Sequence, residues 1–143
     1  MQHPPKTAAI KLESENQLPG YQFHSVFENS VRIGPDYYRN SLIITPETII
    51  PNWPPTVPEH LTVEDLEMII ALQPELILVG TGSVLKFPPP FVLEGIANAG
   101  LGIDFMDSRA ACRTYNVLFA DGRRVAAGVM LNDLFFRSGL TTG

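Results

Sequence analysis

The sequence predicts an α/β fold in three layers, with a central mixed, mostly parallel sheet, flanking helices and an antiparallel β-meander near the N-terminus. Two apolar runs, residues 76–79 and 103–106, the second interrupted only by Asp104, are typical of strands that are covered on both faces. A helical pattern lies between them, and the order strand, helix, strand indicates a parallel βαβ unit. Several short β-rich runs precede this unit, which predicts the meander.

The length of 143 residues suits one domain, which we expect over residues 20–134. Residues 1–19 are expected to form an N-terminal extension and residues 135–143 a flexible tail. Only 17% of the residues are charged, whereas about 25% is usual. A surface with few charges favours contact with other proteins.

The net charge of −5 and the isoelectric point near 5.1 argue against nucleic acid as a partner, because phosphate binding requires a basic surface. Cys112 is the only cysteine, so no internal disulfide forms and a reducing compartment is expected. No apolar run reaches the roughly 20 residues that span a bilayer. The first residues also lack the pattern of a signal peptide. We therefore expect a cytoplasmic protein without a membrane partner.

The meander is expected from β-rich segments at residues 21–26, where Tyr21, Phe23 and Ser25 alternate with Gln22, His24 and Val26, and at residues 31–33 and 42–44. Turn residues separate these segments, the first of them at Glu28, Asn29 and Ser30. Residues 48–50 can add one more strand. Pro54, Pro55 and Pro58 then predict an extended connector that is not helical.

Thr62 predicts the start of the first helix, because Asp65 stands three residues later and can complete a capping box. Pro74 ends that helix. A second helix is expected over residues 90–99, with a proline in its first turn and Gly100 at its end. Its buried side would hold Val92, Leu93, Ile96, Ala97 and Ala99.

Asp107 or Ser108 can cap a third helix that runs towards Ala120. The pair Asp121 and Gly122 also permits a hairpin at this point, since Asp-Gly is a favoured turn pair. We prefer the helix, because its start is well marked and Gly122 suits its end. Residues 125–131 form the last expected strand.

A binding crevice is expected where the strand that ends at Gly80 and the strand that ends at Met106 reach the carboxyl edge of the sheet, because open α/β sheets bind ligands there. Free amides at the start of the third helix and nearby basic side chains would favour a phosphate or carboxylate. The candidate ligand-binding residues are Thr81, Gly82, Ser83, Lys86, Ser108, Arg109 and Arg113.

Simpler interpretations of these residues remain open. The glycines can serve only a sharp turn, while Arg109 and Arg113 pair with Asp104, Asp107 or Asp121. Cys112 is expected to fill space in the core, because no histidine stands near it in the sequence to activate the thiol. The sequence shows no nucleophile with its base and no metal-ligand spacing. No catalytic residue, metal or cofactor is therefore expected.

Two phenylalanines flank a proline run at residues 88–90. If exposed, Phe87 and Phe91 would form a preorganised apolar surface for a protein partner; if buried, they would close the core. Trp53, next to Pro54 and Pro55, presents the same choice and is a third candidate for that surface.

The order of the motifs resembles the small domain family of uncertain biochemistry that includes mitochondrial complex I assembly factor 3 and the adipogenesis-associated domain protein of animals. The resemblance covers residues 20–131, and its most specific part is the segment 109–117. The motifs are Gly80-Thr81-Gly82, the region Phe87 to Phe91, Gly102-Ile103, Met106-Asp107, the run Ala110-Ala111-Cys112-Arg113-Thr114-Tyr115-Asn116, and Gly122-Arg123-Arg124-Val125-Ala126-Ala127.

This resemblance implies a three-layer α/β fold and, as in the mitochondrial member, the role of an assembly partner instead of a catalyst. The first residues lack the arginine-rich pattern of a mitochondrial presequence. We therefore expect a non-catalytic protein-binding or assembly-factor-like module with a protein partner and weak self-association. The alternative is a small-molecule or anion-binding protein, or an enzyme, that uses a basic crevice at the carboxyl edge of the sheet.

Overall fold

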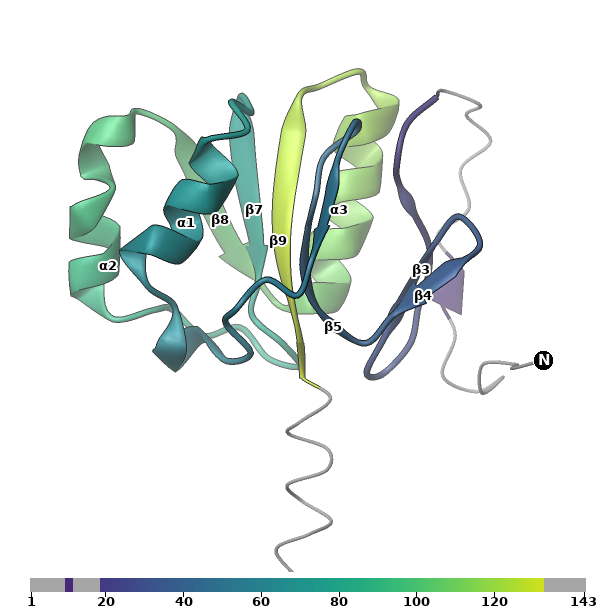
Figure 1. Ribbon diagram of the computed structural model, residues 1–143, viewed down its shortest axis with the longest axis horizontal. Helices are drawn as coiled ribbons and strands as arrows, with labels where there is room; N and C mark the ends of the chain where they lie inside the picture. The colour runs from purple at the N-terminus through teal and green to yellow at the C-terminus, as the bar shows by residue number, and fades with distance from the viewer. Residues whose placement is uncertain (1–9, 12–18, 133–143) are drawn as a thin grey trace, which may run out of the picture.

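A five-stranded sheet forms the centre of the protein in this computed structural model, which describes residues 10–11 and 19–132 (Figure 1). The strand order is β6 (Ile49–Pro51), β5 (Asn40–Ile44), β9 (Val125–Asn132), β7 (Leu76–Gly80) and β8 (Gly102–Met106). β7 pairs in parallel with both β8 and β9, while β5 is antiparallel to β9 and β6 is antiparallel to β5. Four strands thus share one direction, which confirms the mixed, mostly parallel sheet.

A second, antiparallel sheet contains β1 (Ile10–Lys11), β2 (Phe23–Val26), β3 (Val31–Ile33) and β4 (Asp36–Tyr38). The sequence analysis places β1 in the N-terminal extension and does not predict β4, whose residues lack buried apolar alternation. It also assigns residues 42–44 and 48–50 to the meander, and this assignment is wrong. These residues form β5 and β6 and belong to the central sheet, because the continuously buried β5 requires cover on both faces.

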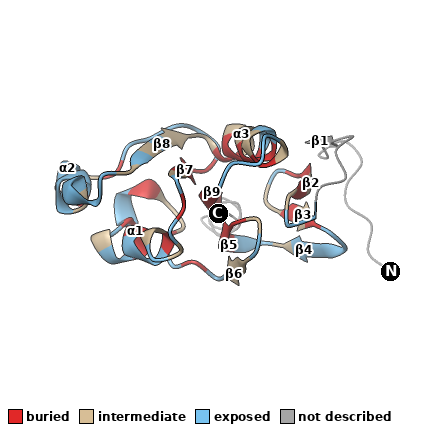
Figure 2. Cartoon of the chain, turned by 90° about the horizontal axis from the view of Figure 1, so that it is seen from above, coloured by how far each residue is buried: buried red, intermediate tan, exposed pale blue. Residues whose placement is uncertain are grey.

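The helices are α1 (Val63–Ile70), α2 (Pro90–Gly95) and α3 (Ser108–Ala120), with 3-10 turns at η2 (Pro58–His60) and η3 (Ala97–Ala99). α3 and the small sheet cover one face of the central sheet, and α1 and α2 cover the other (Figure 2). α3 connects β8 to β9, and β9 lies parallel to β7. The expected third helix is therefore confirmed as α3, and the alternative hairpin at Asp121 and Gly122 does not form.

Strand β9 separates two hydrophobic clusters by the alternation of its side chains. Val125, Ala127 and Val129 belong to the cluster under α3 and the small sheet. Ala126 and Met130 belong to the cluster under α1 and α2. Successive residues of a strand point to opposite faces, so one short strand contributes to both cores.

The first helix begins as expected, and the second is shorter than expected. Thr62 and Asp65 form the capping box of α1. α2 ends at Gly95, and the chain continues as η3. A Cβ at Gly95 would lie 2.5 Å from Val63 Cγ2, so α2 packs closely against α1 at this point.

This packing explains an error in the expected buried face of the second helix. Only Val92 is buried, and Ile96 is half-buried. Leu93 is 37% exposed, and Ala97 and Ala99 are exposed. The expectation assumes one continuous helix, whereas the break after Gly95 changes the direction of the side chains of Ala97 and Ala99.

The connector after β6 also differs from its expected form. Residues 58–60 form the 3-10 turn η2, although the prolines predicted a connector without helix. Pro58 stands at the first position of the turn, where its missing N–H costs no hydrogen bond. The prediction is wrong for this single turn.

Trp53 is 2% exposed, which corrects its assignment to a partner-binding surface. Its indole Nε1 donates a hydrogen bond of 3.1 Å to the Asp65 carbonyl oxygen. The ring packs against β9 at Gly128, where an added Cβ would lie 2.6 Å from Trp53 Cη2. Trp53 is therefore part of the core between α1 and the central sheet.

The small sheet is held on α3 by polar contacts as well as by apolar packing. The Asn116 carboxamide accepts a hydrogen bond from Phe23 N at 2.9 Å and donates one to Phe23 O at 2.8 Å. The Tyr115 hydroxyl donates to Tyr21 O at 2.8 Å. These contacts satisfy backbone groups of β2 and of the residues before it, and they fix the position of the sheet relative to the helix.

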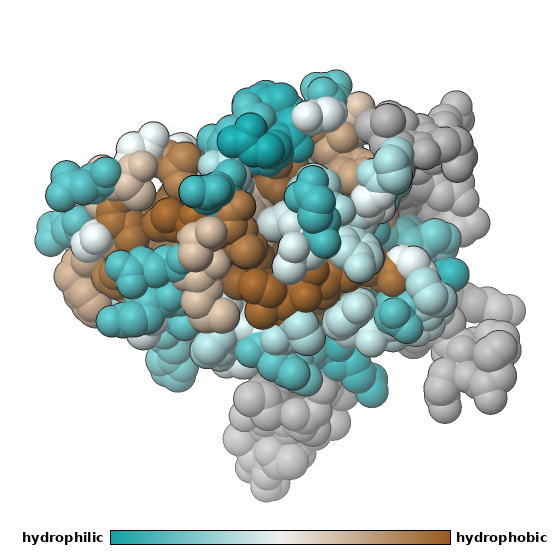
Figure 3. All heavy atoms as spheres, turned by 45° about the horizontal axis from the view of Figure 1, so that its top comes forward, coloured by the Kyte–Doolittle hydropathy of each residue, from teal (hydrophilic) through white to brown (hydrophobic). Residues whose placement is uncertain are grey.

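Hydrophobic residues form a band across the face seen in Figure 3, between more hydrophilic areas.

None of the helices in residues 19–132 is both long and apolar enough to cross a membrane.

We expect Gly128→Ala to lower the free energy of unfolding by about 1–3 kcal/mol, because the new methyl group overpacks the contact with Trp53 and Ile69. Urea unfolding of the purified chain measures this change. The matched control is Gly102→Ala in β8, where an added Cβ meets nothing within 4 Å. Equal unfolding midpoints for the two variants would contradict the expected close approach.

Candidate functional site

The Ser108 side chain joins the carboxyl ends of three parallel strands. Its Oγ accepts a hydrogen bond of 2.8 Å from Gly82 N, after β7, and donates one of 2.7 Å to Met130 O, near the end of β9. Ser108 N, after β8, donates to Gly82 O at 2.8 Å. Gly80 permits this approach, because a Cβ there would lie 2.9 Å from Ser108 Cα.

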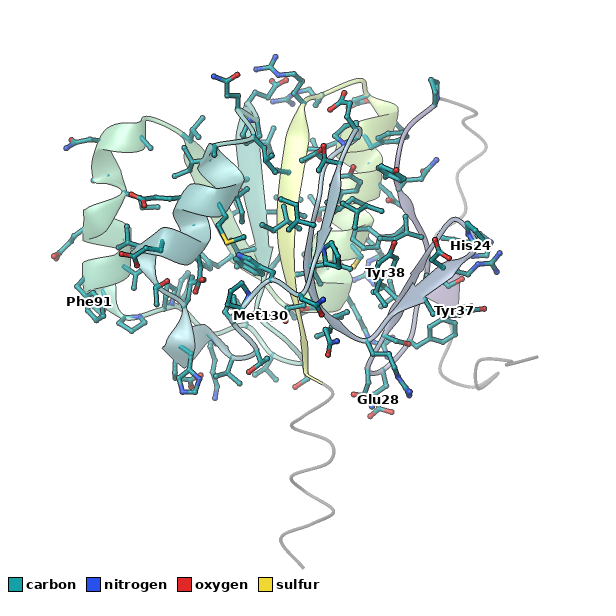
Figure 4. The ribbon with its side chains drawn as sticks, in the orientation of Figure 1. His24, Glu28, Tyr37, Tyr38, Phe91 and Met130 are labelled. Carbon is teal, nitrogen blue, oxygen red and sulfur yellow. The ribbon has the colours of Figure 1, made fainter. Side chains whose placement is uncertain are left out.

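A cavity of about 240 Å³ lies beside this junction, at the carboxyl edge of the central sheet. Its walls come from the β2–β3 turn (residues 26–31), the loop after β7 (82–83), the start of α3 (107–112) and the end of β9 (130–131). Figure 4 shows Glu28 and Met130 towards the same end of the molecule. The cavity therefore lies between the two sheets and the first turns of α3.

Four of the seven candidate ligand-binding residues line this cavity: Gly82, Ser83, Ser108 and Arg109. Thr81 does not line it. The Thr81 hydroxyl donates to Val84 O at 2.7 Å and accepts from Lys86 N at 3.2 Å, so it shapes the loop after β7. The juxtaposition of the two loops follows the expectation, while their role in binding stays a prediction.

Lys86 and Arg113 do not line the cavity either. Lys86 Nζ lies 3.4 Å from Glu59 Oε2 in an exposed ion pair. Arg113 is exposed on α3. Of the three cations that the expected basic crevice combines, only Arg109 lines this cavity.

The charged groups on the walls are Arg109, Glu28 and Asp107. Within residues 10–11 and 19–132 none of the three makes an ion pair, and neither does Arg113. The simpler interpretation, in which the arginines pair with nearby aspartates, is therefore not found in this part of the chain. Asp107 caps α3 and accepts a hydrogen bond from Ala110 N at 2.9 Å.

The sequence analysis missed Glu28 and Asn29 as cavity residues. They lie between the expected strands at residues 21–26 and 31–33, where the sequence analysis predicts only a turn. Their position beside α3 depends on how the small sheet packs on the helix, which the local pattern does not contain. The Asn116 carboxamide is the relevant signal, because a buried amide on a helix needs backbone partners.

Cys112 lies in the apolar part of the cavity wall and is fully buried. Burial raises the pKa of its thiol well above the usual value. The thiol therefore stays protonated at neutral pH, as a packing residue does and a nucleophile does not.

The structure brings one serine and one histidine together, although the sequence analysis found no nucleophile with its base. His24 Nδ1 lies 2.7 Å from Ser25 Oγ. Ser25 is buried in the small sheet, and it does not line the cavity. No group of three or more His, Cys, Asp or Glu side chains suited to a metal occurs among the described residues.

The loop between β7 and α2 and the first turn of α2 carry four exposed apolar side chains: Val84, Leu85, Phe87 and Phe91, here called the apolar loop. Phe87 is 64% exposed and Phe91 is 65% exposed. The Phe87 ring rests edge-on against Phe105 of β8, with 5.8 Å between centroids. Figure 4 shows Phe91 at the outer side of the molecule, where α2 begins.

We expect Ser108→Ala to destabilise the fold by about 1–3 kcal/mol, because it leaves the buried Gly82 N and Met130 O without their partner. Thermal or urea unfolding measures the loss. The matched control is Ser83→Ala, since the Ser83 side chain is exposed and makes no hydrogen bond in the described part of the chain. A loss that is as large in the control would contradict the role of the Ser108 hydroxyl.

We expect Cys112 to react with a maleimide only as fast as the chain unfolds, because the thiol is buried and its pKa is raised. A mass shift over time at pH 7 measures the reaction, and one cysteine makes the stoichiometry unambiguous. Complete labelling within minutes under native conditions would show that the cavity admits reagents to the thiol.

Comparison with curated proteins finds relatives in bacteria and in animals. The chain is 46% identical over 61 residues to the "13 kDa major membrane protein" of Francisella tularensis subsp. holarctica (strain LVS), covering 43% of this chain and 50% of the relative. It is 28% identical over 90 residues to NADH dehydrogenase [ubiquinone] 1 alpha subcomplex assembly factor 3 of Mus musculus, covering 62% of this chain and 48% of the relative. The chain thus spans about half the length of these relatives.

Solved structures with the same fold cover most of the chain. A crystal structure from Bordetella parapertussis matches with a TM-score of 0.74 and 28% identity over 80% of this chain and 98% of the other. An NMR structure from Xanthomonas campestris matches with a TM-score of 0.72 and 30% identity, over 87% and 95%. A Bordetella pertussis protein described as a Mth938-like domain shares the fold at 23% identity, with a TM-score of 0.71 over 86% and 93%.

The family described as a protein of unknown function (DUF498/DUF598) matches residues 23–130. This range holds the central sheet except the last two residues of β9, all three helices, and every residue that lines the cavity except Leu131. The resemblance that the motifs indicated is therefore confirmed. The chain has a Mth938-like α/β fold, is homologous to the NADH dehydrogenase assembly factor 3 of animals, and belongs to the DUF498/DUF598 family.

Proposed function

We propose that this chain is a non-catalytic protein-binding module with an assembly-factor-like role, and that it holds a subunit of a protein complex through the apolar loop. The observation that carries the proposal is the pair of exposed phenylalanine rings, Phe87 and Phe91, in one proline-rich segment. Large aromatic side chains are the residues that most often dominate binding energy at protein interfaces.

The apolar loop is preorganised, which supports a binding role. Thr81 Oγ1 bridges Val84 O and Lys86 N at the start of the loop. Pro88 is buried, and two more prolines, Pro89 and Pro90, lead into α2. A loop that is already ordered loses little conformational entropy when a partner binds.

The relatives support the same role. The mouse relative is named as an assembly factor of an NADH dehydrogenase subcomplex. Cys112 and Ser25, the nucleophile candidates discussed above, are both buried. We infer that this chain contributes an interaction surface and no bond-breaking chemistry. A cytoplasmic location and weak self-association stay predictions.

A photo-crosslinking amino acid at Phe91 should capture one partner protein in living cells. The same amino acid at Val117, which is 62% exposed on α3, is the matched control, because α3 lies on the opposite face of the central sheet. The captured protein is then purified, and its affinity is measured with the native chain and with the Phe87→Ser/Phe91→Ser variant.

We expect the double variant to bind that partner at least about tenfold more weakly, which corresponds to 1.4 kcal/mol, while its unfolding midpoint changes little. The reason is that both rings are exposed in the free chain and become buried only in the complex. Unchanged affinity would overturn the proposed surface, as would equal crosslinking of the same protein from Val117.

A further inference from the structure

We propose that the cavity at the carboxyl edge of the sheet binds a small zwitterion with an apolar side chain, of the class of an aliphatic α-amino acid. Arg109 would hold the carboxylate of this ligand, and Glu28 and Asp107 would hold its ammonium group. The inference is independent of the proposed function, because none of these residues belongs to the apolar loop.

The size of the cavity favours a small ligand. Its volume of about 240 Å³ lies just below the range of roughly 300–1,000 Å³ that is usual for drug-sized ligands. It is lined by four segments that are distant in the sequence, and hydrogen bonds of Ser108 fix three of them. A single amino acid matches this space, whereas a nucleotide exceeds it.

The charges on the walls favour a ligand with both signs. Arg109 provides a guanidinium group that can bind a carboxylate through two parallel hydrogen bonds. Its backbone N–H, at the second position of α3, has no acceptor among the described residues. Arg109 thus has a free backbone donor in addition to its guanidinium group.

The two carboxylates on the same walls argue against a simple anion. Glu28 and Asp107 would repel an anion that Arg109 attracts, and Lys86 and Arg113 lie outside the cavity and do not offset them. A simple cation would in turn meet Arg109. A zwitterion satisfies all three charged side chains, which the described part of the chain leaves without ion pairs.

The remainder of the wall is apolar and sets the type of side chain. Val26, Val31, Cys112 and Leu131 line it and are buried in the folded chain. An aliphatic side chain of the ligand would displace water from this surface at a favourable free energy, whereas a polar side chain would find few partners there. L-Leucine is therefore a suitable first probe.

The test titrates the full chain with L-leucine and follows the backbone amide shifts by NMR. Two further probes each lack one charge: 4-methylpentanoate lacks the ammonium group, and 3-methylbutylamine lacks the carboxylate. We expect leucine to shift the amides of Ser83 and Arg109 saturably, and we expect each of the other probes to bind at least about tenfold more weakly.

Variants assign the two halves of the ligand to the two walls. Arg109→Gln and Glu28→Gln should each weaken leucine binding at least about tenfold, and Arg109→Lys should recover only part of the loss, because lysine cannot form the bidentate contact. Arg113→Gln is the matched control, since Arg113 stands four residues further on the same helix and does not line the cavity.

Three results would overturn the inference. Equal affinity for leucine and 4-methylpentanoate would show a plain carboxylate site, and equal affinity for leucine and 3-methylbutylamine would show a plain cation site. The absence of any saturable shift at millimolar leucine would show that the cavity takes no such ligand. None of these results affects crosslinking at Phe91, so the ligand of the cavity and the partner of the apolar loop are tested independently.

Discussion

The hydroxyl group of Ser108 is the contact on which the carboxyl edge of the sheet depends. Three parallel strands end side by side at this edge, and each must release its chain in a different direction without leaving buried backbone groups unpaired. The Ser108 hydroxyl group forms hydrogen bonds with both Gly82 N and Met130 O. Gly80 has no side chain and so leaves the space in which Ser108 packs against β7. The cavity beside it keeps its shape because its walls share this junction.

A second constraint places the small sheet. Asn116 offers the backbone of Phe23 both an acceptor and a donor, as a neighbouring strand would, and the Tyr115 ring packs edge-on against the Phe23 ring at 5.5 Å. The β2–β3 turn, and with it Glu28, reaches the cavity because this sheet is fixed on α3. The charge of the cavity is thus determined by packing between elements that are distant in the sequence.

The parts of the fold that local chemistry determines could be predicted from the sequence. The capping box at Thr62, the start of α3 after Asp107 and the buried strand β7 each follow from a few adjacent residues. The convergence of the loops after β7 and β8 follows from the rule for parallel strands.

The errors concern contacts between distant segments. The sequence analysis makes Trp53 a candidate surface residue, yet its ring is buried in the core. Gly128, 75 positions later, has no side chain and so leaves the space that this ring occupies. Lys86 was expected beside Arg109, yet it pairs with Glu59. β5 likewise belongs to the central sheet because it pairs with β9, and no local sequence pattern predicts this pairing.

The position of β9 has a consequence for how the chain acquires its structure. This strand lies in the middle of the central sheet, between β5 and β7, and it is the last element of the described chain to be synthesised. Leu42 pairs with Val129, so β5 can pair with β9 only after the ribosome has synthesised 87 more residues. Contacts of such long range make folding slow and leave apolar strands uncovered in the nascent chain. Until translation has passed β9, the two hydrophobic clusters lack the strand that contributes side chains to both of them.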